Sequence, residues 1–318
     1  MNFADQFQTL RSDMVGWRRA FHRLPELGYA EHKTARTVVE LLRSFGITEI
    51  TEGVGKTGVV AILHHGDGPI VGLRADMDAL PIRETGTPPH RSVHDGVMHA
   101  CGHDGHMTML LGAARYLTTA SNFRGTVVLI FQPAEEGKAG AKAMLDDGLL
   151  ERFPVEKIFG LHNMPGAPAS AVAVSPGTVM AAVDKFEVIV TGRGGHSAMP
   201  HLTRDPVLAA SAFVLAAQSI VSRNRDPNSA AVVAITRIAA GEADNATPDV
   251  ALLRGNVRFL ERGGSGTFRE HLQRIGRWSA VTDGVSVEVD YSVGRPPTIN
   301  SEAEALLARR VATELAPV

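Results

Sequence analysis

Residues 125–133 read GTVVLIFQP, an almost continuous apolar run that ends at a proline. Such a run predicts a strand buried on both faces of a sheet. Helical patterns flank it at 105–117 and 139–150, and further short apolar runs occur at 57–63, 69–76 and 157–163. Strands that alternate with helices in this way predict an α/β domain with a mostly parallel sheet.

The pattern changes after about residue 175. Alternating strands and two amphipathic helices follow in the order βαββαβ, at 184–195, 205–223, 230–241, 250–261, 267–281 and 285–293. This order predicts a ferredoxin-like α+β domain inserted at 180–292. The first domain then comprises residues 1–179 plus 293–318, because GRPPTIN (294–300) resembles a return linker and a helix pattern begins at 301.

The composition excludes several classes of function. The chain has 318 residues, of which 44% are hydrophobic, and its 32 basic and 34 acidic residues give a net charge of −2. There is no basic excess for a nucleic-acid partner. No apolar run reaches the roughly 20 residues that span a bilayer, and the N-terminus does not resemble a signal peptide. The single cysteine, Cys101, fits a reducing compartment, so we expect a cytoplasmic protein without a membrane partner.

Polar side chains gather where the predicted strands end. Asp76 and Asp78 follow one strand, Glu135 and Glu136 follow the next, and His162 follows a third. Open α/β sheets bind ligands at this edge, and neighbouring strand ends lie about 5 Å apart. We therefore expect these side chains to meet in one site.

The segment MHACGHDGHM (98–107) adds Cys101 and His103 to that set. A thiolate, imidazoles and carboxylates together suit zinc, manganese, cobalt or nickel. The adjacent pair Glu135–Glu136 indicates a division of labour, in which one carboxylate binds metal and the other takes a proton from water. A bound metal lowers the pKa of water from 15.7 towards about 7, which suits a carboxylate base.

An alternative makes Cys101 a nucleophile with His99 or His103 as its base. The helix that follows would favour a thiolate at this place. This hypothesis leaves Glu135–Glu136 and His162 without a role, so the sequence favours the metal site.

Three polar residues of the inserted domain are further candidates. His196 lies in the glycine-rich segment TGRGGHSAMPH (191–201) and could donate to a developing oxyanion. Arg258 lies within an apolar strand, and its planar fork suits a substrate carboxylate. Asn245, in ADNATPD, is open to a structural or a binding role.

Taken together, these segments resemble the two-domain metallo-amidohydrolases of the aminoacylase/carboxypeptidase group. The similarity is greatest to the branch of hippurate hydrolases, auxin-conjugate hydrolases and N-acyl-amino-acid deacylases. The segments that carry it, in chain order, are HRLPELGYAE (22–31), LRADMDALP (73–81), MHACGHDGHM, FQPAEEG (131–137), GLHNMP (160–165), GRGGHSAMPH, DNATPD and GNVRF.

The resemblance implies two divalent metal ions bridged by Cys101. One ion would be held by Cys101, His103 and His162, and the other by Cys101, Glu136 and a further histidine. Other branches carry a metal-binding histidine at the position of Asp76, so Asp76 is not counted as a ligand and His103 replaces it. The family continues beyond the linker and supplies its last histidine there, whereas no histidine follows His271 in this chain.

The resemblance also implies the remaining roles. Glu135 would be the general base of an amidohydrolase that cleaves N-acyl amino acids, and Asp78 would orient a ligand. The inserted domain would form a homodimer in which His196 reaches the partner's site, while Asn245 and Arg258 hold the substrate carboxylate. We expect a shortened form of such an enzyme; the alternative is a non-catalytic remnant that binds metal and dimerises.

Overall fold

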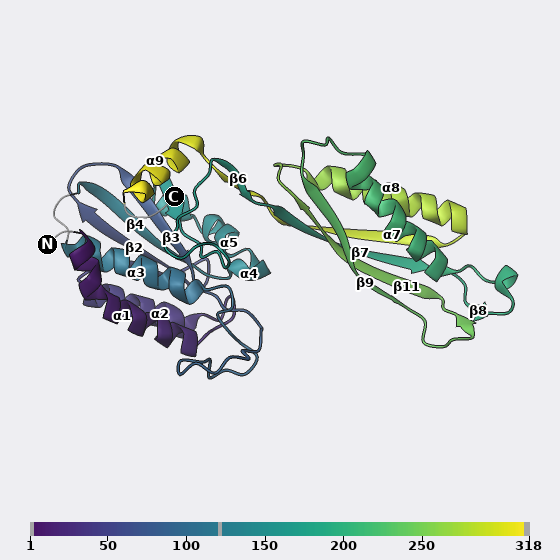
Figure 1. The fold of residues 1–318 in the computed structure, drawn as a ribbon, viewed down its shortest axis with the longest axis horizontal. Helices are drawn as coiled ribbons and strands as arrows, with labels where there is room; N and C mark the ends of the chain where they lie inside the picture. The colour runs from purple at the N-terminus through teal and green to yellow at the C-terminus, as the bar shows by residue number, and fades with distance from the viewer. Residues whose placement is uncertain (1–2, 120–122, 315–318) are drawn as a thin grey trace. The chain divides into compact units, whose positions relative to one another are not determined.

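The computed structural model describes residues 3–119 and 123–314. The chain divides into two compact units, residues 1–168 and 169–318, and each is considered by itself. Figure 1 shows the helices and strands of both.

The first unit is built on a five-stranded sheet of order β1-β2-β4-β3-β5. Its strands are β1 (Glu49–Val54), β2 (Gly58–His65), β3 (Ile70–Asp76), β4 (Gly125–Gln132) and β5 (Lys157–Gly160). The α/β prediction is confirmed, but the sheet is mixed rather than mostly parallel. Strand β3 runs parallel to β4 and β5, whereas β1, β2 and β4 pair antiparallel. The cause is the short turn at 55–57, which folds β1 and β2 into a hairpin.

Helices cover both faces of this sheet, which explains its apolar runs. One face packs against α1 (Phe3–Arg23), α2 (His32–Ser44) and α3 (His103–Thr119) through a core that includes Phe21, Leu42, Leu111 and Phe131. The other face packs against α5 (Gly140–Asp146) and α6 (Leu149–Arg152) through Val60, Ile130, Met144 and Leu149. The segment α4 (Glu135–Lys138) directly follows the turn after β4.

The second unit confirms the predicted βαββαβ order. Its elements are β7 (Ala182–Thr191), α7 (Pro206–Arg223), β9 (Ala231–Ala240), β11 (Val250–Phe259), α8 (Ser265–Asp283) and β12 (Ser286–Arg295). The strands form an antiparallel sheet of order β12-β7-β11-β9, and both helices lie on one face of it (Figure 1). Asp205 caps α7, accepting from the backbone N–H groups of Val207 and Leu208.

Short elements complete the second unit. Strands β6 (Gly177–Met180) and β13 (Thr298–Asn300) pair antiparallel, so the segments that lead into and out of the α+β region lie side by side. The others are β8 (Gly195–His196), η1 (Pro200–Leu202), β10 (Ala246–Thr247) and α9 (Glu302–Thr313). The proposed boundaries at 179/180 and 292/293, and the return of the chain to the first domain, stay predictions.

Within the described ranges, α7 is one helix long and apolar enough to cross a membrane by length and composition. Part of this apolar character belongs to the core, because Ala209, Phe213, Ala217 and Ile220 pack against the sheet. Core helices of soluble proteins pass the same test. The absence of a membrane partner therefore stays a prediction.

Candidate metal centre

The candidate centre lies at the carboxyl-terminal edge of the parallel strands β3, β4 and β5. Asp76 ends β3 opposite Gln132 of β4, and the loop after β4 carries Glu135 and Glu136. His162 follows the end of β5 by two residues. The loops that the sequence predicts to converge thus leave the sheet at one edge, where open α/β sheets bind their ligands.

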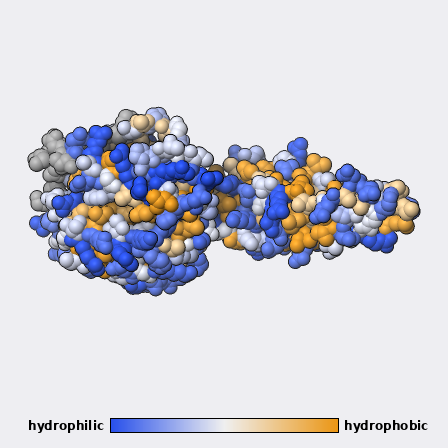
Figure 2. All heavy atoms as spheres, turned by 90° about the horizontal axis from the view of Figure 1, so that it is seen from below, coloured by the Kyte–Doolittle hydropathy of each residue, from blue (hydrophilic) through white to orange (hydrophobic). Residues whose placement is uncertain are grey.

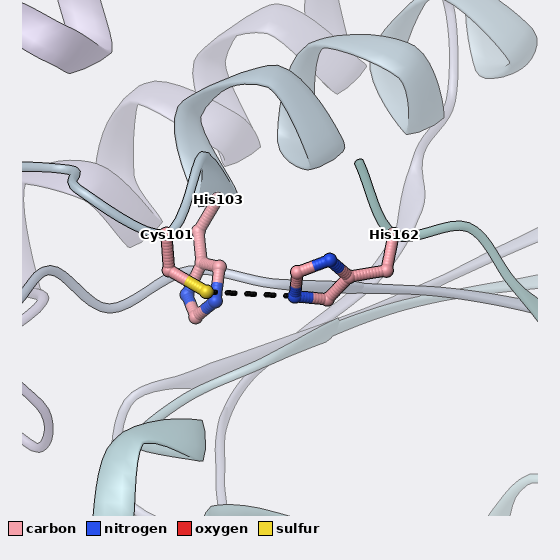
Figure 3. Close-up of side chains that lie close together, drawn as sticks. All are labelled: Cys101, His103 and His162. Atoms are coloured by element: carbon pink, nitrogen blue, oxygen red, sulfur yellow. Dashed lines mark hydrogen bonds between the residues drawn. The ribbon is translucent and has the colours of Figure 1, made fainter. Parts of the chain in front are cut away.

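Cys101, His103 and His162 face one another at this edge (Figure 3). The Cys101 Sγ lies 3.5 Å from Nε2 of His162. One ligand atom from each of the three residues lies within 4.8 Å of the other two, which is the arrangement a single metal ion requires. His103 begins α3, Cys101 precedes that helix, and His162 belongs to the loop after β5.

His103 also connects this group to the two glutamates. It forms a second cluster with Glu135 and Glu136, again with ligand atoms within 4.8 Å, and its Nε2 lies 4.0 Å from Oε1 of Glu136. Its Nδ1 lies 3.4 Å from Oδ1 of Asp78. Burial disfavours the charged imidazole, but Asp78, Cys101 and Asp76 outweigh it and raise the pKa of His103 to about 10.

The residues fit a metal. Both ring nitrogens of His103 are buried without a well-aligned hydrogen bond among the described residues, and a buried polar atom is costly to leave unpartnered. The neighbouring thiol and carboxylates are donors that zinc, manganese, cobalt and nickel accept. A divalent ion would satisfy the imidazole and compete with its proton.

Asp78 holds the loop that carries the glutamates. Its two carboxylate oxygens accept from the backbone N–H groups of Glu135 and Glu136, each at 2.9 Å. Burial alone would raise the pKa of Asp78, but its contact with His103 and its hydrogen bonds from the Glu136 and Glu135 N–H groups outweigh it and lower that pKa. The ionised carboxylate thus contacts both His103 and the glutamate loop.

Asp76 is occupied by other partners. Its Oδ2 accepts from Arg74 at 2.8 Å, and its Oδ1 lies 2.7 Å from Nδ1 of His106. Burial raises the pKa of Asp76, but His106 and Arg74 outweigh it and lower that pKa. Asp76 could join His103 and His106 in a third ligand cluster, yet both its oxygens already have partners, which favours a supporting role.

His106 and Asn163 are site residues that sequence reasoning missed. The backbone N–H of Asn163 donates to Nε2 of His106, and the Asn163 carbonyl accepts from Nδ1 of His162 at 2.7 Å. Together these bonds leave Nε2 of His162 to face Cys101. Gly102 permits the close approach, because it has φ +89° and a Cβ there would collide with the Asn163 side chain.

The alternative thiol nucleophile finds no support at His99. Neither ring nitrogen of this buried side chain has a hydrogen-bond partner among the described residues. Burial lowers the pKa of His99 to about 4, so its imidazole is neutral at pH 7. Cys101 lies beside His162 and beside His103, the other base that the thiol hypothesis offers.

The three candidates of the second unit do not form one cluster within it. His196 and Asn245 are neighbours, because β8 pairs with β10 and the Asn245 carbonyl accepts from the Ser197 N–H. Arg258 pairs with Val183 at the far end of β7. His196 follows the other end of that strand, at Thr191. Thr191 lies eight positions along the strand from Val183, or about 26 Å at ~3.3 Å per residue. All three candidates are exposed.

Comparison with known proteins places this geometry among amide-bond hydrolases. The model of peptidase family M20/M25/M40 matches residues 72–318. The chain is 43% identical to a hippurate hydrolase of Campylobacter jejuni, over 99% of this chain and 82% of that protein. It is 41% identical to an IAA-amino acid hydrolase of Arabidopsis thaliana, over 96% and 72%. A dinuclear metal-binding peptidase of the M20 family from Bacillus subtilis superposes with a TM-score of 0.81 at 35% identity, over 97% of this chain and 81% of that one.

Proposed function

Because this chain belongs to peptidase family M20/M25/M40, we propose that it is a metal-dependent amidohydrolase that cleaves the amide bond of N-acyl amino acids. One observation carries the proposal: Cys101, His103 and His162 converge at the sheet edge, with Glu135 and Glu136 beside His103. Relatives named for hydrolysis of hippurate and of IAA-amino acids and for deacetylation of N-acetylcysteine support a substrate in which an acyl group is joined to an amino acid.

We assign the ligands from the resemblance to the metallo-amidohydrolases and from the side chains that meet here. Cys101, His103 and His162 would hold one divalent ion, and Glu136, which lies beside His103, would help to hold a second. A bound divalent metal supplies a positive charge that polarises the scissile carbonyl and favours ionisation of water. Asp78 supports this arrangement, because it contacts His103 and two N–H groups of the glutamate loop.

Glu135 would be the general base. Its carboxylate takes a proton from the attacking water and returns it to the amine that leaves. The bond from the Glu135 N–H to Asp78 fixes the start of its side chain. General base catalysis of this kind contributes about 10²- to 10⁴-fold to the rate.

The second unit would bind the substrate carboxylate and form a homodimer. His196 and Asn245 lie far from Arg258 along the sheet, so two copies could present them to one substrate where one copy could not. Exposed apolar residues support a self-contact: Leu208 and Leu215 of α7 are 62% and 76% exposed, and β9 is an edge strand. Figure 2 shows hydrophobic side chains on the surface of this unit.

A cytoplasmic location is part of the proposal. Cys101 is free and half-buried, and a thiolate ligand must stay reduced to bind metal. Reducing compartments keep such thiols available.

The test is hydrolysis of hippurate, IAA-amino acids and N-acetyl amino acids after loading with manganese, zinc or cobalt. Glu135→Gln should abolish turnover while metal content stays unchanged. Glu151→Gln is the control, because Glu151 is an exposed glutamate of α6, and its turnover and metal content should equal those of the parent. Equal turnover in Glu135→Gln would end its assignment as base. Activity that survives dialysis against a chelator would instead favour the Cys101 thiol hydrolase.

A second candidate is a metal-binding protein without turnover. It is favoured by the ligand groups among the described residues, since all three of these groups share His103. Elemental analysis separates the two, because about two ions per chain fit the hydrolase and about one fits the binding protein.

A further inference from the structure

The segment PELGYAE (25–31) lies against the loop that carries Glu135. No pattern in the sequence predicts this contact. The Lys138 ammonium donates to the Gly28 carbonyl at 2.8 Å, and the Tyr29 hydroxyl donates to the Lys138 carbonyl at 2.9 Å. A Cβ on Gly28 would lie 3.0 Å from the Ala134 Cα, so the two backbones are in close contact.

Glu31 makes the deepest contact of this segment. Its side chain is 0% exposed. Its Oε1 accepts from the Ala134 N–H at 2.7 Å, and its Oε2 accepts from the Thr57 hydroxyl at 2.6 Å. Within the described part of the chain, no ion pair involves Glu31, so these hydrogen bonds compensate its burial.

Ala134 is the residue that turns the chain from β4 into the glutamate pair. It has φ +50° and ψ +45°, the left-handed conformation. Alanine is disfavoured there, and such a residue persists only where its surroundings fix it. The hydrogen bond from the Ala134 N–H to Glu31 is one of the contacts that fix this conformation.

Three consecutive backbone N–H groups of this turn donate to two buried carboxylates. Ala134 donates to Glu31, and Glu135 and Glu136 donate to Asp78. Asp78 also contacts His103, whereas the hydrogen bonds of Glu31 go to Thr57 and Ala134. Glu31 therefore acts on the glutamate loop through the Ala134 N–H, whereas it is Asp78 that contacts His103.

We propose that Glu31 is a positioning residue whose carboxylate fixes the Ala134 turn and thereby aims Glu135 and Glu136 at the metal centre. The proposal rests on the roles assigned to those two glutamates. It predicts that loss of the Glu31 oxygen disturbs both glutamates at once, while loss of the negative charge alone does not.

Two variants separate these effects. Glu31→Ala removes both acceptors, whereas Glu31→Gln keeps an oxygen for the Ala134 N–H and lets its amide donate to Thr57. Glu26→Ala is the matched control. Glu26 lies in the same segment and accepts from Lys33 and Thr34 of α2, so it binds a helix and not the glutamate loop.

The full chain is titrated with cobalt(II) alone, and kcat, KM and Tm are measured on the loaded protein. Glu31→Ala should weaken cobalt binding and lower kcat by about 10-fold or more, as loss of residues that support metal ligands does, with little change in KM. Glu31→Gln should stay within about 2-fold of the parent in cobalt affinity and in kcat. Glu26→Ala should lower Tm and leave cobalt affinity and kcat unchanged.

The proposal is overturned if Glu31→Ala lowers Tm like Glu26→Ala but keeps the parent's cobalt affinity and kcat per loaded site. It is also overturned if Glu31→Gln is as impaired as Glu31→Ala. Should Glu31→Ala not fold, Glu31→Asp keeps the charge but draws the carboxylate back from the Ala134 N–H by one methylene, and an unchanged kcat and cobalt affinity would then contradict the proposal. The cobalt affinities of the variants test the role of Glu31 even if the parent protein cleaves no N-acyl amino acid.

Discussion

The backbone N–H of Asn163 donates to Nε2 of His106 at 3.1 Å. Since the carbonyl of the same residue accepts from His162, His106 restrains the loop that presents His162 to the metal centre. The opposite nitrogen of His106 is fixed by Asp76, which Arg74 holds in turn. A row of side chains therefore runs from β3 to a proposed metal ligand.

Replacement of His106 by alanine should weaken metal binding by about 10- to 100-fold, the usual cost of losing a partner that orients a ligand. The dissociation constant for zinc, measured by competition with a chromophoric chelator, checks this. His64→Ala is the control, because His64 is exposed and its imidazole bonds to the Thr126 hydroxyl, away from the metal centre. Equal zinc affinity in His106→Ala and the parent would contradict the role of this row.

The pH dependence of stability should change when Glu31 is replaced by glutamine. Burial is the largest influence on Glu31 and raises the pKa of its carboxyl above the ordinary 4.5. The folded protein therefore keeps this proton to a higher pH than the unfolded chain does. The stability that Glu31 contributes is greatest below about pH 4.5 and falls as the pH rises through the folded-state pKa.

Urea unfolding of the parent and of Glu31→Gln, between about pH 4 and pH 8, measures the effect. The free energy of unfolding of the parent should fall relative to that of the variant as the pH rises. A constant difference over the whole range would show that Glu31 titrates as it does in the unfolded chain.

The proposed dimer should depend on the exposed face of α7. Leu215→Glu places a charge on a side chain that is 76% exposed in the single chain, so the isolated unit should keep its stability. Buried in an apolar interface, the same charge is strongly unfavourable. Sedimentation equilibrium should show a dimer for the parent and a monomer for the variant.

Leu145→Glu is the control for Leu215→Glu, because it places the same charge on an exposed leucine of α5 in the first unit. A Leu215→Glu protein with the same mass as the parent would place the self-contact elsewhere or exclude it.

Much of the fold follows from local patterns. The apolar run at 125–133 forms β4, and the alternation at 184–191 lies within β7, because burial on two faces or on one leaves a readable periodicity. The direction of a strand relative to its neighbours has no comparable signal in the sequence. The apolar residues at 57–63 fit a parallel or an antiparallel strand equally well, so the sequence pattern did not predict the antiparallel pairing of β2 with β4.

The candidate site likewise contains some contacts that the sequence predicts and others that it does not. Residues at the ends of parallel strands meet because topology brings them together, which is why Glu136 and His162 could be expected near Cys101. His106 and Asn163 are 57 positions apart, and Glu31 and Ala134 are 103 apart. Such contacts depend on how α3 and the segment before α2 pack, and no spacing in the sequence indicates them.

The central claim is a metal centre with Cys101 as a thiolate ligand. Cobalt(II) added to the full chain should produce a near-ultraviolet band from sulfur-to-metal charge transfer, because a thiolate bound to cobalt absorbs there, and Cys101→Ser should lose that band. Cobalt that binds without the band, or a band that persists in Cys101→Ser, would contradict the claim.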